Sequence, residues 1–424
     1  MIDPRKIRIF TISTSDVHGG AARAAYRIYH GVRELGIDSL MFVKHKGSND
    51  PNVRELAEFV PHHPIYIALD WIMRKIKNKW QHHKWHPYAR TKQNAYMSDL
   101  RSTYLHGALR KLDYDVLHLH WINQRFLDIR ELIKVNKPIV WTLHDSWAFC
   151  GVCHYFQNCD KYQTHCGACP MLGSKHEHDL AYEVFSRKRS AYKGLDMHIV
   201  TPSKWLGECA KRSALLGQYP IWVIPNCIDV EFYKPTEKKR VIANQLGLNP
   251  NKRYLLFGAM NATCDKNKGF DLLIQALSIF SGVDVELLIY GTNENIDKYA
   301  LPIPVHSYGY IHGEEQMVRL YNVADITIVP SINENLSNTI MESMSCGTPV
   351  AAFDIGGNGD MIDHKQNGYL ARKNDTDDLA QGIQWCLTNN HDNILGKNAR
   401  EKVLNNYTPE IVCKKYIELY ESLL

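Results

Sequence analysis

No uninterrupted apolar run in this sequence approaches the roughly 20 residues that a membrane-spanning helix needs. The amino-terminal residues contain neither the long apolar region nor the small-residue cleavage site of a secretory signal. We therefore expect a cytoplasmic protein, and a peripheral place at the inner face of the cytoplasmic membrane is left open. An aromatic-glycine RNA-binding signature and a Lys/Arg-rich tail are also absent, and the net charge is only +5, so we expect no nucleic-acid partner.

Length and composition indicate a folded protein with more than one domain. The 424 residues exceed what one hydrophobic core usually organises, and the 45% apolar and 22% charged content is ordinary for a globular protein. Short apolar strands alternate with helical patterns in the first half, which predicts βαβ units around a parallel sheet. The predicted strands are Ile7–Ile12, Ser39–Val43, Val116–His120, Ile139–Leu143 and His198–Thr201, and the predicted helices are Ala21–Leu35 and Leu100–Leu112.

A second strand–helix series begins after Pro220–Asn226 and the polar stretch Lys234–Arg240, which we interpret as the connection between two domains. We therefore expect an α/β fold with two Rossmann-like, doubly wound domains, 1–226 with a Cys-rich insertion at 147–175, and 227–407, followed by a last helix at 408–424. The predicted strands here are Tyr254–Met260, Val285–Tyr290, Asp325–Val329 and Pro349–Phe353, and the predicted helices are Phe270–Phe280, Glu314–Tyr321, Ser337–Ser345, Asp378–Leu387 and Pro409–Leu424.

The most informative motif follows the predicted strand Asp325–Val329. A polar loop carries Glu334, a helix begins near Ser337 and Asn338, and Glu342 lies about one turn inside that helix. Open α/β sheets bind ligands at the carboxyl ends of strands, helix starts hold anions, and carboxylates accept hydrogen bonds from sugar hydroxyls. The combination suits a nucleotide-sugar. Taken singly, Glu334 is as well explained as an exposed loop acid and Glu342 as a surface helix residue.

The segment 330–350, together with 353–358, resembles the Glu-x7-Glu signature of retaining GT-B glycosyltransferases of family 4. The resemblance extends over essentially the whole chain. It implies two domains facing a cleft, with the last helix packed back on the first domain. It also implies that Glu342 binds the nucleotide ribose and that Glu334 lies beside the donor sugar. The donor-binding residues expected around the helix start are Leu336, Ser337 and Asn338.

Two further loops are candidates for contact with the donor diphosphate. Gly19-Gly20 follows the first strand, where glycines let backbone approach a ligand, although a tight turn also needs glycine and the three-glycine dinucleotide spacing is missing. Lys268-Gly269 resembles the family's Lys-Gly, whose lysine pairs with the leaving diphosphate. Many relatives carry an arginine six residues earlier. Ala262 stands there in this chain, so we expect Lys266 or a backbone group to substitute, or a weaker clamp.

His144-Asp145 ends another predicted strand. The family has a histidine at this place that contacts the donor sugar and phosphate. We therefore expect His144 to position the sugar and stabilise charge, with Asp145 as an acceptor-side base or an orienting group. A lone histidine is otherwise usually structural. The sequence Asp113-Tyr114-Asp115 has the form of a metal-binding Asp-x-Asp but precedes a strand, so we interpret it as a solvated turn and expect no metal or other cofactor for catalysis.

Five of the eleven cysteines fall in the Cys-rich insertion. In a reducing compartment a clustered set is better explained by metal than by disulfides, and we expect a structural zinc ion without a catalytic role. Free thiols or a pair of disulfides are the other interpretations. The predicted ligands are Cys153, Cys159, Cys166 and Cys169, with Cys150, His154 and His165 as alternatives.

The segment 71–92 contains many lysines and arginines, three histidines and no acid, and its apolar residues Trp71, Ile72, Ile76 and Trp80 have helical spacing. This pattern suits an amphipathic helix on an anionic membrane surface. A solvated helix whose apolar side closes the first domain explains it equally well.

These features together predict a glycosyltransferase that moves a hexosyl unit from a UDP- or GDP-linked sugar to a saccharide acceptor, expected to be lipid-linked. The resemblance implies net retention at the anomeric carbon. Residues 147–149 and 153–155 resemble the subgroup that builds bacterial exopolysaccharide, including colanic-acid-type enzymes. A sugar-nucleotide 2-epimerase of the same fold and a catalytically silent carbohydrate-binding scaffold are the rival classes.

Overall fold

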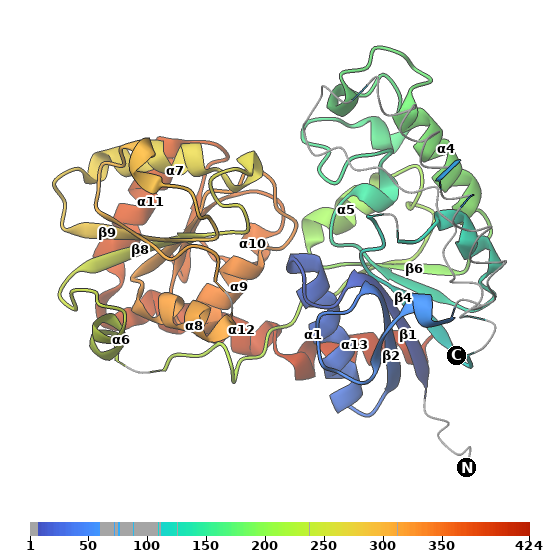
Figure 1. Ribbon diagram of the computed structural model, residues 1–424, viewed down its shortest axis with the longest axis horizontal. Helices are drawn as coiled ribbons and strands as arrows, with labels where there is room; N and C mark the ends of the chain where they lie inside the picture. The colour runs from blue at the N-terminus through green and yellow to red at the C-terminus, as the bar shows by residue number, and fades with distance from the viewer. Residues whose placement is uncertain are drawn as a thin grey trace. The chain divides into compact units, whose positions relative to one another are not determined.

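The computed structural model describes residues 7–59, 112–124, 126–236, 238–311 and 313–424, with a few single positions between 60 and 111. The predicted helix Leu100–Leu112 and the segment 71–92 lie almost wholly outside the described residues. The chain divides into two compact units, Met1–Ile224 with Cys413–Leu424, and Pro225–Val412 (Figure 1). The domain limits expected from the sequence stay predictions, because compactness does not test whether either unit folds alone.

The first unit is built on a parallel sheet with the strand order β3-β2-β1-β4-β5-β6-β7. All residues of β4 and β5 are buried, which explains their continuous apolar sequence. The strands are β1 (Arg8–Ser15), β2 (Asp38–His45), β3 (Val53–Glu55), β4 (Val116–Leu119), β5 (Ile139–Thr142), β6 (Met197–Thr201) and β7 (Ile221–Val223).

The edge strand β7 corrects one prediction. We expected Pro220–Asn226 to be part of the connection between domains, but Ile221–Val223 pairs in parallel with β6. Pro220 and Pro225 flank the strand, and proline is tolerated at the ends of an edge strand, where no partner needs its missing N–H. The connection therefore begins after β7.

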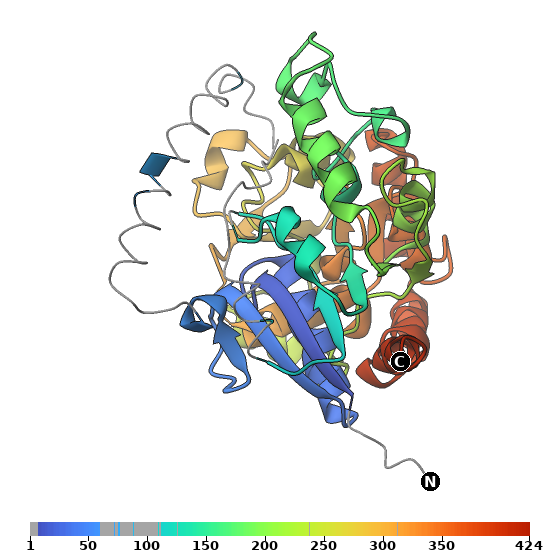
Figure 2. The same ribbon diagram turned by 90° about the vertical axis from the view of Figure 1, so that its right-hand side faces the viewer.

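The helices of the first unit include the carboxyl-terminal helix, which confirms that the end of the chain packs on this unit. Cys413 Sγ lies 3.8 Å from the carbonyl oxygen of Ile28 in the first helix, and Tyr416 Oη lies 3.0 Å from Thr142 Oγ1 at the end of β5. Figure 2 shows this helix end-on, at the C label. The helices are α1 (Gly20–Glu34), α4 (Leu180–Tyr192), α5 (Lys204–Arg212) and α13 (Pro409–Glu421).

The second unit contains a second parallel sheet, in the order β10-β9-β8-β11-β12-β13. Its strands are β8 (Arg253–Gly258), β9 (Val285–Tyr290), β10 (Val305–Ser307), β11 (Ile326–Val329), β12 (Val350–Phe353) and β13 (Gly368–Ala371). Its helices are α6 (Lys239–Gln245), α7 (Phe270–Leu277), α8 (Glu314–Val323), α9 (Asn338–Ser345), α10 (Asn358–Met361), α11 (Thr376–Asn389) and α12 (Ile394–Asn406).

Helices cover both faces of this second sheet. Helices α7 and α11 pack together on one face, and α8, α9 and α12 lie on the other (Figure 1). Two parallel sheets with covered faces confirm the expected Rossmann-like, doubly wound architecture. Within the described ranges, no helix is both long and apolar enough to cross a membrane.

Candidate active site

In the second unit, the strand order reverses between β8 and β11. The chain leaves β8 to build β9 and β10 on one side of it, and then returns to add β11, β12 and β13 on the other. Such a switch point is where open α/β sheets bind ligands, at the carboxyl ends of the strands. Lys268 lies in the turn after β8 and Glu334 in the loop after β11, and their Nζ and Oε1 atoms are 2.8 Å apart. The hydroxyl of Ser331 donates to the same carboxylate oxygen at 3.1 Å.

These two loops are fixed to one another by backbone as well as by side chains. The N–H of Ile332 donates to the carbonyl of Asn267 at 2.9 Å, and the amide of Asn333 donates to the Asn267 side chain at 2.9 Å. Gly269 has φ +70°, and a Cβ there would lie 1.8 Å from the carbonyl oxygen of Pro330. The glycine after Lys268 is therefore required by close approach, and the ion pair is held on a rigid support.

A third loop, after β12, packs on the backbone of Glu334. A Cβ at Gly356 would lie 1.9 Å from the carbonyl oxygen of Glu334, and the N–H of Gly357 donates to Asn335 at 2.7 Å. Because β8, β11 and β12 are neighbours in the sheet, their following loops converge at one edge. The Lys268–Glu334 pair lies at this convergence, with the two side chains 24% and 12% exposed.

Glu342 lies inside α9, as predicted, and only 1% of its surface is exposed. The hydroxyl of Tyr321 on α8 donates to Glu342 Oε2 at 3.1 Å, and Tyr321 lies 3.0 Å from the hydroxyl of Tyr290. Ser337 occupies the N-cap position of α9, but its side chain makes no capping hydrogen bond. Leu336 and Ser337 are buried, and Asn338 is half-buried.

The structure explains why position 262, where the resemblance leads one to expect an arginine, is occupied by alanine. Ala262 is completely buried, and its N–H donates to the carbonyl of Gly291 at 3.1 Å, so the backbone here packs against the end of β9. A long cation at this position would need the loop to rearrange. Of the two nearby lysines, Lys266 is exposed, whereas Lys268 is directed at Glu334.

The first unit has its own switch point, between β1 and β4. Gly19 and Gly20 follow β1, and Gly19 is the N-cap of α1 with φ +97°, a conformation that favours glycine. The N–H of Thr14, near the end of β1, donates to the carbonyl of Trp121 at 2.7 Å, which joins β1 to the loop after β4. Gly19, Gly20, His144 and Asp145 thus belong to the first unit, and Lys268, Glu334 and Glu342 to the second.

His144 follows β5 and lies beside a second histidine that the sequence analysis did not single out. His144 Nε2 is 3.0 Å from His120 Nδ1, and the two rings are stacked. Burial lowers the pKa of His144 to about 4, and the charge of Asp145 offsets this only in part. His144 is therefore a neutral imidazole near neutral pH.

Asp145 is held by three donors. The N–H of Trp147 donates to Oδ1 at 2.8 Å, the indole N–H of Trp121 donates to Oδ2 at 2.8 Å, and His154 Nδ1 is hydrogen-bonded to Oδ2. Burial by itself would raise the pKa of Asp145, but His154 and these hydrogen bonds hold it below its ordinary value. The carboxylate is ionised and accepts three hydrogen bonds from the protein.

Zinc binding by Cys153, Cys159, Cys166 and Cys169 stays a prediction. Across the described part of the chain, no three His, Cys, Asp or Glu side chains come together in a way that could hold a metal ion. The thiols of Cys153 and Cys169 are hydrogen-bonded to each other, and the sulfur of Cys166 accepts from the N–H of Gly151 at 3.2 Å. All five cysteines of the insertion instead line one cavity of about 10 Å³, and none of them forms a disulfide.

A buried lysine stabilises the same insertion. The ammonium of Lys188 on α4 lies 3.7 Å from the ring centroid of Trp147 and donates to the carbonyl oxygens of Trp147, Cys150 and Gly151. Desolvation lowers its pKa to about 7. These bonds satisfy the backbone of the loop that follows His144 and Asp145.

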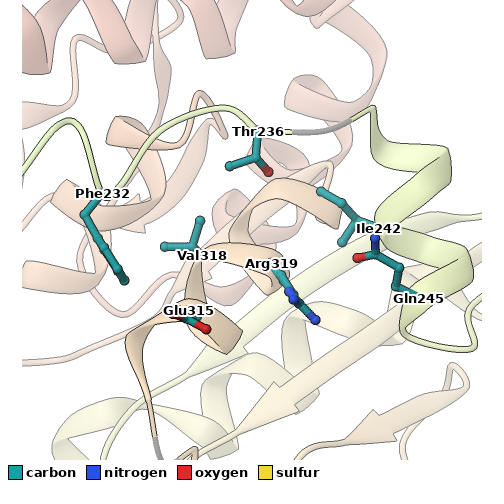
Figure 3. Close-up of a pocket in the computed structure, with 7 residues that line it drawn as sticks. All are labelled: Phe232, Thr236, Ile242, Gln245, Glu315, Val318 and Arg319. Carbon is teal, nitrogen blue, oxygen red and sulfur yellow. The ribbon is translucent and has the colours of Figure 1, made fainter.

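The second unit also has a surface pocket away from these residues. It has a volume of about 270 Å³ and lies between α6 and α8 (Figure 3). None of the predicted site residues lines it, so it is not evidence for the expected donor site. The lining residues are Phe232, Thr236, Ile242, Gln245, Glu315, Val318 and Arg319.

Three functional candidates were missed by sequence reasoning: His120, Tyr321 and His154. His120 was predictable, because it ends the predicted strand Val116–His120 and so lies at the sheet edge where ligands bind. Tyr321 lies on the apolar face of a helix, so its position in the sequence pattern indicated a core residue and gave no sign that its hydroxyl contacts Glu342. His154 was named only as an alternative metal ligand, and its bond to Asp145 depends on the fold of the insertion.

Two family models match the chain. Residues 18–232 match the family described as Glycosyltransferase Family 4, and residues 238–402 match the family described as Glycosyl transferases group 1. WcaC of Escherichia coli, a putative colanic acid biosynthesis glycosyl transferase, is 24% identical over 324 residues, which cover 74% of this chain and 76% of that protein. An Escherichia coli UDP-Gal:alpha-D-GlcNAc-diphosphoundecaprenol alpha-1,3-galactosyltransferase is 24% identical over 275 residues, 58% of this chain and 68% of that protein.

Solved structures of similar fold cover nearly the whole chain. Sucrose-phosphate synthase from Thermosynechococcus elongatus gives a TM-score of 0.67 at 19% identity and covers 98% of this chain and 99% of that one. Anabaena HepE in complex with UDP and glucose gives a TM-score of 0.66 at 16% identity, over 98% of this chain and 100% of that one. At these identities the likeness shows the fold, which is the expected GT-B architecture.

Proposed function

The chain belongs to glycosyltransferase family 4, a family of retaining enzymes, and from this premise we propose that it transfers a hexosyl unit from a UDP-linked sugar to a saccharide acceptor. The observation that carries the proposal is the Lys268–Glu334 pair at the switch point of the second sheet, beside the helix that contains Glu342. We propose UDP and not GDP as the nucleotide, because HepE was solved with UDP and glucose, and the galactosyltransferase relative is named for a UDP-sugar.

In the proposed reaction, the bond between C1 of the sugar and the diphosphate oxygen breaks, and the acceptor oxygen bonds to C1 with net retention. The proton of the acceptor hydroxyl leaves with the departing diphosphate. Negative charge grows on the leaving diphosphate. The ammonium of Lys268 stabilises this charge. Because Lys268 is only partly exposed, its electrostatic interaction is screened less than it would be in bulk water. Catalysis in this family is typically independent of a metal ion.

The two carboxylates of the second unit take different roles in this proposal. Glu334 is paired with Lys268 and lies in the loop at the strand end, so we assign it to the donor sugar. Glu342 is deeper, with Tyr321 on one oxygen, and we assign it to the ribose hydroxyls. The helix start at Leu336, Ser337 and Asn338, and the loop with Lys266, complete the proposed donor site of the second unit. Gly19 and Gly20, in the first unit, stay predicted donor contacts.

For the first unit, we propose that His144 hydrogen-bonds the donor sugar or its phosphate as a neutral imidazole. The contacts of Asp145 favour a role as an orienting group over a role as an acceptor-side base. A carboxylate that already accepts from Trp121, Trp147 and His154 is poorly placed to take a proton from an acceptor, so we assign it to orientation.

The acceptor is proposed to be a lipid-linked saccharide of bacterial surface polysaccharide synthesis, used at the cytoplasmic face of the membrane. This rests on the two Escherichia coli relatives, one named for colanic acid biosynthesis and the other for a diphosphoundecaprenol acceptor. The segment 71–92 is the proposed membrane contact, on the strength of its charge pattern alone.

We propose that the Cys-rich insertion braces the loop behind His144 and Asp145 and takes no part in the chemistry. The bonds from Lys188 to the loop carbonyls and from His154 to Asp145 support this role. Elemental analysis of protein purified without added metal tests whether zinc contributes. One zinc ion per chain would support the ligands expected from the sequence. Absence of zinc would mean that the packed thiols and Lys188 stabilise the insertion without a metal ion.

The test of the proposed function is product formation from a panel of UDP- and GDP-linked hexoses. The protein is incubated with each donor, with and without membrane lipids from a polysaccharide-producing bacterium, in the presence of a chelator. We expect release of UDP that depends on the lipid acceptor, and a glycosidic linkage with the anomeric configuration of the donor. An epimerised nucleotide-sugar formed without acceptor would instead identify a 2-epimerase, and no reaction with any donor would favour a silent scaffold.

A further inference from the structure

Three histidine rings lie in series at the carboxyl ends of β4 and β5. His118 and His120 alternate along β4 and its end, and their ring centroids are 4.2 Å apart. His120 Nδ1 lies 3.0 Å from His144 Nε2. His118 and His120 are each 1% exposed. Three neutral imidazoles in this arrangement raise the question of which nitrogen carries each proton.

His118 is fixed by partners on both nitrogens. Its Nδ1 lies 2.7 Å from the hydroxyl of Tyr420 on α13, and its Nε2 lies 2.8 Å from the hydroxyl of Thr142. A hydroxyl can donate or accept, so either tautomer of His118 is satisfied. His118 makes no hydrogen bond to His120 and does not dictate its tautomer.

His120 has a partner on one nitrogen only. Among the residues that the structure describes, nothing lies within hydrogen-bonding reach of its buried Nε2. A buried N–H without an acceptor is rarer and less favourable than a buried lone pair without a donor. Burial and the neighbouring rings lower the pKa of His120 well below its usual value, so it carries a single proton. That proton is therefore on Nδ1, and Nδ1–H donates to His144 Nε2.

The tautomer of His144 follows from that bond. A nitrogen that accepts a hydrogen bond carries no proton, so neutral His144 has its proton on Nδ1. An Nδ1–H group can donate a hydrogen bond to a sugar hydroxyl or a phosphate oxygen. In the Nε2–H tautomer, His144 Nδ1 would carry a lone pair instead. An ionised phosphate oxygen has no proton to donate to it.

We propose that His120 is a positioning residue that holds His144 in the Nδ1–H tautomer, so that His144 acts on the donor as a hydrogen-bond donor. The second half of this statement rests on the proposed function, whereas the first half stands on the geometry of the first unit alone. The two halves therefore need separate measurements.

The first measurement is the tautomer. Long-range proton–nitrogen correlation spectra of the full chain with labelled histidine distinguish an Nδ1–H ring from an Nε2–H ring, and the His144 signals are identified by their loss in His144→Gln. We expect the Nδ1–H pattern for His144 near neutral pH. An Nε2–H pattern in the parent protein overturns the proposal whatever the variants do.

Two variants of His120 distinguish its hydrogen bond to His144 from its contribution to packing. In His120→Asn the side-chain amide can occupy the place of Nδ1 and donate to His144, whereas His120→Leu fills space without donating. We expect His120→Asn to keep the Nδ1–H pattern and His120→Leu to lose it. Tyr420→Phe is the matched control, because it removes a hydrogen bond from His118 in the same cluster without touching His144. An unchanged His144 pattern in a folded His120→Leu protein contradicts the proposal.

The second measurement is transfer kinetics with the UDP-sugar used in the panel. A donor hydrogen bond that strengthens as charge develops affects turnover more than ground-state binding. We expect His120→Leu to lower kcat by about tenfold or more with KM for the donor changed less than threefold, and His120→Asn to recover most of the loss. Equal effects of both variants on kcat contradict the positioning role. Absence of transfer in the parent, with the Nδ1–H pattern present, counts against the proposed function and leaves the tautomer assignment standing.

Discussion

Single residues determine the charge state of the first unit's site. His118, His120 and His144 are all kept neutral by burial, with the pKa of His118 lowered to about 3 and that of His144 to about 4. A protonated imidazole in this cluster would lose solvation, and a second protonated ring would be repelled by the first. In the proposed function, His144 therefore acts as a neutral hydrogen-bonding group.

The same residues predict how stability depends on pH. In the unfolded chain an exposed histidine binds a proton as the pH falls through about 6.5, whereas the folded protein keeps His144 neutral until about pH 4. The unfolded state thus binds more protons between these values, so the stabilisation is present above about pH 6.5 and is lost as the pH falls toward 4. We expect the free energy of unfolding to fall by roughly 1 kcal/mol per pH unit for each buried imidazole in this window.

Urea unfolding at about pH 7 and about pH 5 measures this dependence. His144→Gln should weaken the pH dependence, because one of the buried sites is removed. Identical pH profiles for the parent and His144→Gln would contradict the assigned protonation state.

At the scale of elements, the loops after β8, β11 and β12 depend on close backbone contact that only glycine permits. Gly269 and Gly247 both have φ +70°, but a Cβ at Gly269 would meet the carbonyl of Pro330 at 1.8 Å, whereas nothing lies within 4 Å at Gly247. Comparing alanine substitutions at the two positions therefore distinguishes the cost of the left-handed backbone conformation from the cost of the steric clash with Pro330. An alanine at either costs about 1–2 kcal/mol for the left-handed conformation, and at Gly269 the loop must also move.

We expect Gly269→Ala to lower the free energy of unfolding by several kcal/mol and to weaken binding of UDP, because the displaced loop carries Lys268. Gly247→Ala should cost no more than about 2 kcal/mol and leave binding of UDP unchanged. Denaturant unfolding and calorimetry on the two proteins check this. Equal destabilisation in both would show that the contact with Pro330 does not constrain the loop.

The accuracy of the sequence predictions also differs by element. Each predicted strand is present, because buried parallel strands have nearly continuous apolar sequences that local patterns reveal. Four strands were missed: β3, β7 and β10, which have only three residues each, and β13, which begins with a glycine, a residue depleted in strands. The cysteine spacing suggested four ligands around one metal, but the partners of Cys153 and Cys166 are set by folding of the whole insertion.

At the scale of the whole molecule, the sequence located the strand ends that carry the candidate residues. Glu334, Lys268 and His144 were all chosen because they follow predicted strands, and each lies at the carboxyl end of its sheet. What the sequence did not provide was the strand order, which makes β8 and β11 neighbours and so brings Lys268 to Glu334. Side-chain pairing across such long separations depends on topology, which local patterns do not encode.

The central claim is that UDP binds through Lys268, in the second unit, without a metal ion. Isothermal titration of UDP into the full chain, in buffer with a chelator, tests it most directly, using Lys268→Ala and the control Lys402→Ala. Lys402 is matched because it pairs with Asp363 at 2.9 Å and its side chain is 26% exposed, against 24% for Lys268. We predict that UDP binds the parent and Lys402→Ala alike and that Lys268→Ala weakens binding by about tenfold or more, the scale of a lost charge-assisted hydrogen bond. Failure of the parent to bind UDP, or equal affinity in Lys268→Ala, would contradict the account.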